Sequence, residues 1–108
     1  MPKSVKYIFE IKLKAGCTAK QYMEAWKKGS AIIQKSKGAR GTILFRKVDD
    51  PTTLLAIASW DSTEIRYVAM ESLRNELQEV RNVVDKHEEY ATFNSLGYFE
   101  EIAQVNPE

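Results

Sequence analysis

The sequence has 108 residues, which is the usual size of one domain, and we treat residues 1–108 as a single domain. Its 16 basic and 15 acidic residues leave a formal net charge of +1, so it lacks the basic surface of a nucleic-acid-binding protein. The single cysteine, Cys17, permits no internal disulfide and suits a reducing compartment. No apolar run has the length of a signal peptide or a membrane span. We therefore expect a cytoplasmic protein with no nucleic-acid or membrane partner.

The first third of the chain predicts a strand followed by a helix. Residues 4–13 alternate between apolar and polar side chains, which indicates a strand with one buried face. Thr18 and Gln21 have the spacing of a capping box, in which each side chain satisfies a free backbone amide at a helix start. Apolar residues continue at helical spacing to Ile33, with Gly29 inside the run. Gly29 has two explanations: a surface or kink glycine, or close approach by a ligand or another backbone.

The middle of the chain predicts a hairpin. Residues 38–41 contain two glycines and end the helix. Residues 42–48 and 54–60 then read as strands, separated by the aspartate- and proline-containing segment 49–53. A gap this short favours an antiparallel pair.

A second helical region follows the hairpin. Asp61 with Glu64 three residues later predicts the helix start, with Asp61 as the N-cap. Apolar positions then recur at helical spacing through Ile65, Val68, Leu73, Leu77, Val80, Val84 and His87. This region is long for a small domain, so two helices broken near Ser72 are the alternative to one.

The final strand and the order of elements predict the fold. Residues 90–102 return to a strand pattern, in which Gly97 is a candidate bulge. The order β-α-β-β-α-β predicts an α+β, ferredoxin-like fold with a four-stranded antiparallel sheet. Two helices cover only one face of such a sheet, yet neighbouring residues such as Ile43 and Leu44 are apolar on both faces. Large exposed apolar faces are rare in monomers, so we expect a two-fold homodimer through the uncovered sheet face.

Four sequence features occur in an order that resembles one known family. They are the strand 7–13 followed by Ala15-Gly16 and a helix with Trp26; Gly38-Ala-Arg-Gly41 before the second strand; Asp49-Asp-Pro51 before the third; and Ile57-Ala-Ser-Trp-Asp-Ser62 at its end. Together they resemble the antibiotic biosynthesis monooxygenase (ABM) family of dimeric α/β barrels. The resemblance covers about residues 5–70, and the last third matches in element type only.

The resemblance implies a cofactor-independent monooxygenase that acts on a small aromatic or quinol-like compound. Members of this family oxidise polycyclic phenols and quinols without metal or flavin, because the substrate anion itself passes an electron to oxygen. The protein orients that anion and stabilises it within apolar walls. We therefore expect no cofactor and no metal.

Two other functions remain open for a chain of this fold, because fold alone does not fix function. One is a dimeric module that binds a small molecule without turnover, and the other is a cofactor-free isomerase. Oxygen uptake separates the oxygenase from both. Replacing His87 with alanine should abolish an isomerase and leave the oxygenase nearly unchanged.

One branch of related proteins degrades haem, and the sequence departs from its pattern. Members of that branch carry an asparagine on the first strand, a tryptophan on the third strand, and a histidine about ten residues after the tryptophan. Trp60 is present here, but the first strand offers Tyr7, and Met70 stands where the histidine is needed. The haem ligand is therefore missing, and haem degradation is set aside.

Three residues are candidates for catalytic roles: Trp60, Tyr67 and His87. Trp60 could stack on an aromatic substrate, and Tyr67, seven residues later, could donate a hydrogen bond in the same cavity. His87 is the only histidine, and histidine exchanges protons readily near neutral pH. Each also has an ordinary explanation: core packing for Trp60, packing or surface for Tyr67, and a favourable helix terminus for His87.

Three further residues are candidates for substrate binding: Tyr22, Trp26 and Arg46. Tyr22 and Trp26 are four residues apart and share one helix face, where they could form a cavity wall or simply fill the core. Arg46 could bind a phenolate or carboxylate, or form a surface ion pair. A metal site is not expected, because His87 has no second histidine and the chain has one cysteine.

Overall fold

The computed structural model describes residues 4–76 and 78–108. In chain order the elements are β1 (Val5–Leu13), α1 (Ala19–Ile33), β2 (Ala39–Arg46), β3 (Thr53–Trp60), α2 (Thr63–Glu76), α3 (Gln78–Tyr90) and β4 (Ala91–Glu100). The expected β-α-β-β-α-β order is confirmed, with the second helical region split into α2 and α3. The sheet order is β2-β3-β1-β4, and every neighbouring pair is antiparallel. The α+β fold class is therefore confirmed.

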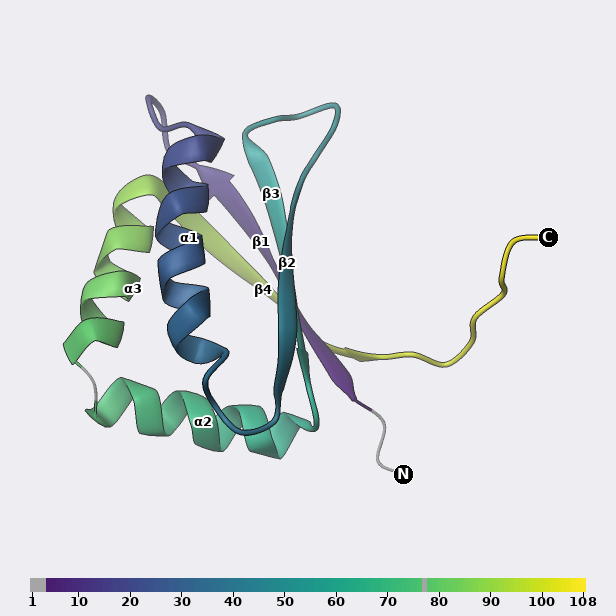
Figure 1. The fold of residues 1–108 in the computed structure, drawn as a ribbon. Coiled ribbons are helices and arrows are strands. Elements are labelled where there is room, and N and C mark those ends of the chain that lie inside the picture. The colour runs from purple at the N-terminus through teal and green to yellow at the C-terminus, as the bar shows by residue number, and fades with distance from the viewer. Residues whose placement is uncertain (1–3, 77) are drawn as a thin grey trace.

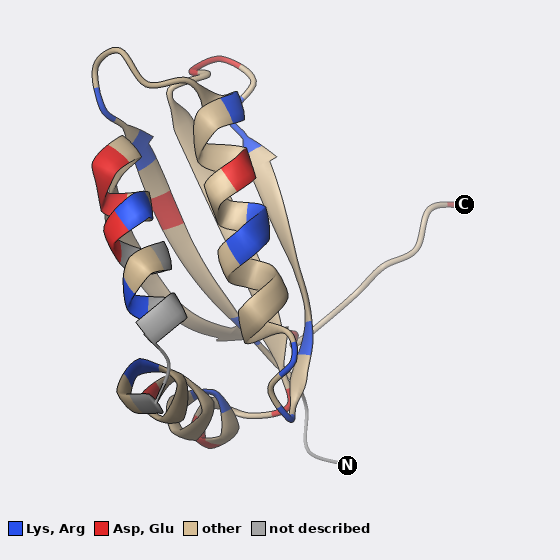
Figure 2. Ribbon diagram, turned by 60° about the vertical axis from the view of Figure 1, so that its left-hand side comes forward, with Lys and Arg blue, Asp and Glu red and all other residues tan. Residues whose placement is uncertain are grey.

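The helices form one layer on one side of the sheet. α1 and α3 lie side by side along the strands, and α2 crosses at the end of that layer (Figure 1). Acidic and basic positions are interspersed along α1 and α3 (Figure 2). Within the described residues, no helix combines the length and the apolar character that a membrane span needs. The chain beyond β4 extends away from both layers (Figure 1).

The start of α1 is capped as its sequence predicts. The backbone amide of Gln21 donates to Thr18 Oγ1 at 3.1 Å, and the amide of Thr18 donates to Gln21 Oε1 at 2.8 Å. One face of α1 then packs on the sheet. The described core cluster is Ile11, Tyr22, Leu54, Ala56 and Ala91, drawn from α1, β1, β3 and the start of β4. The apolar side of β1 that the period-two pattern predicts therefore packs against the helices through Ile11.

The predicted N-cap of the second helical region is wrong. The N-cap is Ser62, whose Oγ accepts from the amide of Ile65 at 3.1 Å. Asp61 is instead held by Arg40, whose Nε and Nη2 donate to its two carboxylate oxygens at 2.7 and 3.0 Å. This two-pronged contact occupies the carboxylate, so the next hydroxyl caps the helix.

The break in this region also lies later than predicted. α2 ends at Glu76 and α3 begins at Gln78, so the helix is not interrupted at Ser72. Of the predicted apolar stripe, Leu77 and the side chains of Val80 and Val84 lie outside the described residues.

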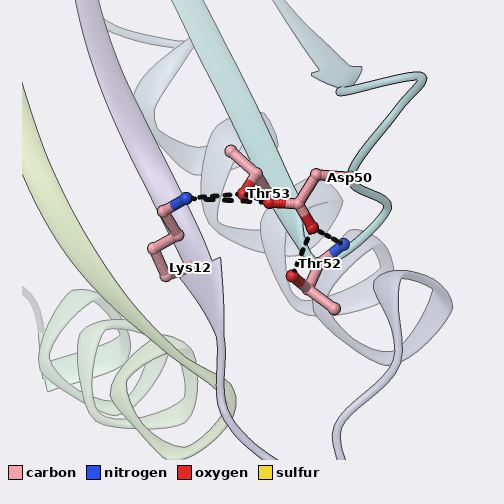
Figure 3. A network of polar contacts seen from close by, with 4 residues as sticks. All are labelled: Lys12, Asp50, Thr52 and Thr53. Carbon is pink, nitrogen blue, oxygen red and sulfur yellow. Dashed lines mark hydrogen bonds and ion pairs between the residues drawn. The ribbon is translucent and has the colours of Figure 1, made fainter.

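The β2–β3 turn is closed by hydrogen bonds to one carboxylate (Figure 3). Asp50 Oδ1 accepts from Thr52 Oγ1 at 2.7 Å, and Asp50 Oδ2 accepts from Thr53 Oγ1 at 2.7 Å. Lys12 of β1 donates to Thr53 Oγ1 at 2.7 Å, and its Nζ lies 3.9 Å from Asp50 Oδ2. Hydrogen bonds from Thr53 and then Thr52 lower the pKa of Asp50 to about 2. The predicted hairpin is therefore confirmed, and Lys12 links its turn to β1.

A bulge in β4 changes which side chains face the helices. Ile8 pairs with Gly97 and the next residue, Phe9, pairs with Ser95, so Leu96 is the extra residue. Gly97 has φ +96°, a conformation that glycine adopts without strain. The shift brings Tyr98 opposite Tyr7, on the side of the sheet that faces the helices. The predicted bulge at Gly97 is confirmed.

The opposite side of the sheet is apolar and is covered by none of the described helices (Figure 1). Cross-strand pairing places Ile8, Ile43, Phe45, Leu55, Ile57 and Phe99 on this side, which we call the open sheet face. Ile43 is 59% exposed, and Phe45 and Phe99 are 47% and 48% exposed. The prediction that apolar residues occupy both sides of the middle strands is therefore confirmed.

Candidate active site

A cavity of about 480 Å³ lies between the sheet and the three helices. Its volume falls in the range of small-molecule sites in proteins. The helices contribute residues at one-turn intervals, including Trp26, Ser30 and Ile33 from α1, and Arg66, Met70 and Arg74 from α2. Such spacing brings side chains to one face of a helix. The sheet contributes alternate residues, among them Tyr7, Phe9, Ala58, Trp60, Phe93 and Ser95.

Gly29 is part of this wall. It is buried on α1 and lines the cavity. A glycine at this position leaves open the space that a side chain would fill. The structure thus places Gly29 in the cavity wall and not on the outer surface of α1.

Aromatic rings form a continuous part of the lining. The ring centroids of Tyr7 and Phe9 are 5.9 Å apart, and those of Phe9 and Phe93 are 6.1 Å apart in an edge-on arrangement. His87 lies 6.3 Å from Phe93. These separations are those of interacting rings. A flat aromatic ligand would therefore find both faces and edges of rings to pack against.

Two ring nitrogens in the lining have no hydrogen-bond partner among the described residues. They are Nε1 of Trp60, whose residue is only 1% exposed, and Nε2 of His87. Indole Nε1 is a donor, whereas imidazole Nε2 either donates or accepts according to its tautomer. Buried polar atoms usually have a partner, because leaving one unsatisfied costs about 1–3 kcal/mol. Trp60 and His87, which line the cavity, thus carry two unsatisfied ring nitrogens within its wall.

Arg66 is held at the cavity by two tyrosines. Its guanidinium carbon lies 3.6 Å from the ring centroid of Tyr7, and its Nη1 donates to Tyr98 Oη at 3.0 Å. The hydroxyl of Tyr7 donates in turn to Ser95 Oγ at 2.8 Å. The planar guanidinium is therefore fixed against an aromatic face, which is a favourable arrangement for arginine.

Tyr22 lies behind the cavity wall. Its side chain is fully buried, and its ring centroid lies 5.2 Å from that of His87 and 6.1 Å from that of Phe93. Burial raises the pKa of Tyr22 well above its usual range, so its phenol stays neutral near pH 7. Its position supports the orientation of His87, because the two rings are in contact.

The structure brings together some of the residues chosen from the sequence and separates others. Trp26, Trp60 and His87 line the cavity. Tyr67 does not: it is 65% exposed, because the residue after Arg66 lies about 100° further round α2. Arg46 lines a different pocket, of about 410 Å³, with Met23. It lies four residues along β2 from Thr42 in the cavity wall, a distance of about 13 Å.

Sequence reasoning missed Arg66, one of the two arginines of the cavity wall. Arg66 belongs to the series Arg66, Met70, Arg74, in which four-residue steps place basic residues on one helix face. That spacing was a usable signal. The partners of Arg66 on β1 and β4 were not, because Tyr98 reaches the cavity side only through the bulge. Among the described residues, no group of three or more histidine, cysteine, aspartate or glutamate side chains could hold a metal ion.

Comparison with known proteins establishes the fold. No family model matches the sequence, and no curated protein matches it. Among solved structures, SnoaB from Streptomyces nogalater, a cofactor-independent oxygenase, has a TM-score of 0.77 at 15% identity, covering 98% of this chain and 99% of its own. A candidate antibiotic biosynthesis monooxygenase from Nitrosomonas europaea has a TM-score of 0.75 at 10% identity, covering 98% and 97%.

A third solved structure has the same fold without an assigned function. It is a conserved protein from Bacteroides thetaiotaomicron described as a possible oxidoreductase, with a TM-score of 0.71 at 14% identity, covering 94% of this chain and 100% of its own. At such identities the similarity is one of fold. The fold expected from the resemblance to the ABM family is thus confirmed over nearly the whole chain, including the last third.

Proposed function

We propose that this chain, which shares its fold with SnoaB and with candidate antibiotic biosynthesis monooxygenases, is a cofactor-independent monooxygenase acting on a small aromatic or quinol-like compound. The observation that carries this proposal is the aromatic-walled cavity, whose lining residues Trp60 and His87 carry buried, unpartnered ring nitrogens. The size of the cavity suits a compound of a few fused rings. In this proposal Trp26 forms part of the binding wall, and no cofactor is needed.

The proposed chemistry draws its electrons from the substrate. A phenol or quinol with an activated methylene group loses a proton to solvent, and the resulting anion transfers an electron to O₂. The radical pair combines to a peroxide, which loses water and leaves a carbonyl group. One oxygen atom ends in the product and the other in water, so no external reductant is consumed. Trp60 Nε1 donates to the oxygen that bears the developing negative charge.

Oxygen consumption tests this proposal directly. The purified protein, treated with a chelator, is supplied with a panel of quinols, anthrones and catechols in an oxygen electrode. We expect uptake with at least one class of compound. Trp60→Phe keeps an aromatic ring but removes the donor, and should reduce the turnover rate by roughly 10²-fold.

Tyr67→Phe is the matched control for Trp60→Phe. It also removes one polar group from an aromatic ring, but the hydroxyl lies outside the cavity lining. Its uptake should equal that of the wild type. Uptake absent across the whole panel, or undiminished in Trp60→Phe, would contradict the proposal.

A cofactor-free isomerase is the second candidate, and the buried Nε2 of His87 in the cavity is what favours it. Such an enzyme would move a proton within its substrate and consume no oxygen. Its turnover would continue under anaerobic conditions and would disappear in His87→Ala. Binding of aromatic compounds without any turnover would identify a binding module instead.

We also propose that two copies associate through the open sheet face, and that the protein resides in the cytoplasm. The apolar character of that face supports the dimer, because monomeric proteins rarely expose large contiguous apolar patches. The free thiol of Cys17 is compatible with a reducing compartment.

A further inference from the structure

The charged residues that line the cavity are both arginines. Arg66 and Arg74 belong to the lining, and no aspartate or glutamate does so among the described residues. Charges near low-dielectric protein interact more strongly than charges in water. A cavity with this composition attracts anions and disfavours cations.

The two arginines differ in how their charges are compensated. Arg74 Nη1 lies 3.3 Å from Glu71 Oε1, one turn earlier on α2. For Arg66, no carboxylate of the described residues lies within ion-pair distance, and its contacts are the ring of Tyr7 and the hydroxyl of Tyr98. Both of these partners are neutral acceptors. The charge of Arg66 is therefore the one available to a ligand.

The contacts of Arg66 also fix the orientation of its donors. One face of the guanidinium lies on the Tyr7 ring, and one nitrogen is used by Tyr98. A guanidinium carries five N–H donors, so a pair of them stays free for a carboxylate, which accepts two parallel hydrogen bonds. Because the side chain is already ordered, binding loses little conformational entropy.

We propose that Arg66 binds a carboxylate group of the substrate, which makes the ligand class of this cavity the aromatic carboxylic acids. The inference deepens the proposed oxygenase function and rests on it for the reaction. The binding step does not depend on turnover, however, and is measured separately. In this arrangement the rings of the ligand pack against the aromatic walls of the cavity. The carboxylate of the ligand binds Arg66 and so fixes which end of the molecule lies there.

The test compares two ligands that differ in one charge. Anthraquinone-2-carboxylate and anthraquinone-2-carboxamide have nearly the same shape, and both are already oxidised. The chain contains two tryptophans, Trp26 and Trp60, and both line the cavity, so quenching of their fluorescence reports binding there. We expect the wild type to bind the carboxylate roughly tenfold more tightly than the amide.

Variants at position 66 distinguish a direct contact between Arg66 and the carboxylate from general electrostatic attraction of an anion to the protein. Arg66→Gln should lose the preference for the carboxylate and keep the affinity for the amide. Lys27→Gln removes the same charge from an exposed position on α1 and should keep the preference. Circular dichroism checks that each variant is folded. If Arg66→Gln fails to fold, Arg66→Lys, which keeps the charge but lacks the fork, should weaken carboxylate binding several-fold and leave the amide unaffected.

The outcomes distinguish this proposal from the proposed reaction. Equal affinities for the two ligands in the wild type, binding of neither, or an undiminished preference in a folded position-66 variant would overturn the carboxylate site. A clear preference that depends on Arg66, together with no oxygen uptake on any phenol or quinol, would leave the site standing and reject the oxygenase.

Discussion

Both the backbone conformation and the packing at position 38 require a glycine. Gly38 has φ +89° at the entry to β2, and a Cβ there would collide with Cγ2 of Ile65 on α2. The left-handed conformation alone costs a residue with a side chain about 1–2 kcal/mol. We expect Gly38→Ala to lower the free energy of unfolding by more than this amount, as measured by urea denaturation, because overpacking adds to the strain.

Gly16 provides the matched control for Gly38. It has φ +82°, and a Cβ added there would meet nothing within 4 Å, so Gly16→Ala carries the backbone strain alone. If the two substitutions destabilise the protein equally, contact with Ile65 is not the cause. A double variant Gly38→Ala/Ile65→Ala should recover part of the loss, since it removes the methyl group that collides.

Single residues also show how far the sequence could predict the site. Trp60 and His87 can be identified because their side-chain chemistry is rare in this chain, and both line the cavity. Arg46, a predicted binding residue, lies on the same side of the sheet as the cavity but lines another pocket. Alternation says nothing about position along a strand. That position is set by where α2 crosses the layer, which depends on packing between distant segments.

The β2–β3 hairpin is an element whose stability should depend on acid. The pKa of Asp50 is about 2 in the folded chain, below its ordinary value of 3.8, because Thr53 and Thr52 donate to the carboxylate. A depressed pKa means that the contribution to stability is complete above about pH 4. It is lost as the pH falls through the range from about 4 to about 2.

Asp50→Asn tests this contribution of the hairpin. We expect the variant to be less stable than the wild type at pH 7 in urea denaturation, with a difference that shrinks as the pH approaches 2. Asp49→Asn, at the exposed neighbouring position, is the control and should show no such pH dependence. A difference that is constant from pH 7 to pH 2 would show that the carboxylate charge is not involved.

The elements themselves were largely predictable, with two informative exceptions. The capping box predicts the start of α1, and the alternation of apolar and polar residues predicts β1. Both signals depend only on residues close together in the sequence. The pattern of β4 could not be assigned to faces, because Leu96 is an inserted residue that shifts Tyr98 to the cavity side. The cap of α2 moved to Ser62, because Arg40, which is distant in sequence, occupies Asp61.

The assembly of the whole molecule is testable through the open sheet face. We expect light scattering to give the mass of a dimer at micromolar concentration. Phe45→Glu should give the mass of a monomer, because it places a charge in an apolar contact. Val48→Glu is the control: Val48 is 99% exposed in the β2–β3 turn, outside that face, and the variant should stay dimeric. A monomeric wild type would reject the proposed dimer.

The absence of α2 from the described core has a consequence for how this molecule can change. None of the buried core residues described lies on α2, yet α2 supplies Arg66, Met70 and Arg74 to the cavity. Most proteins sit just above a stability threshold, so substitutions in the core are quickly eliminated. Substitutions along this one helical stripe avoid that penalty. The residues that α2 supplies to the proposed ligand site can therefore change while the core is retained.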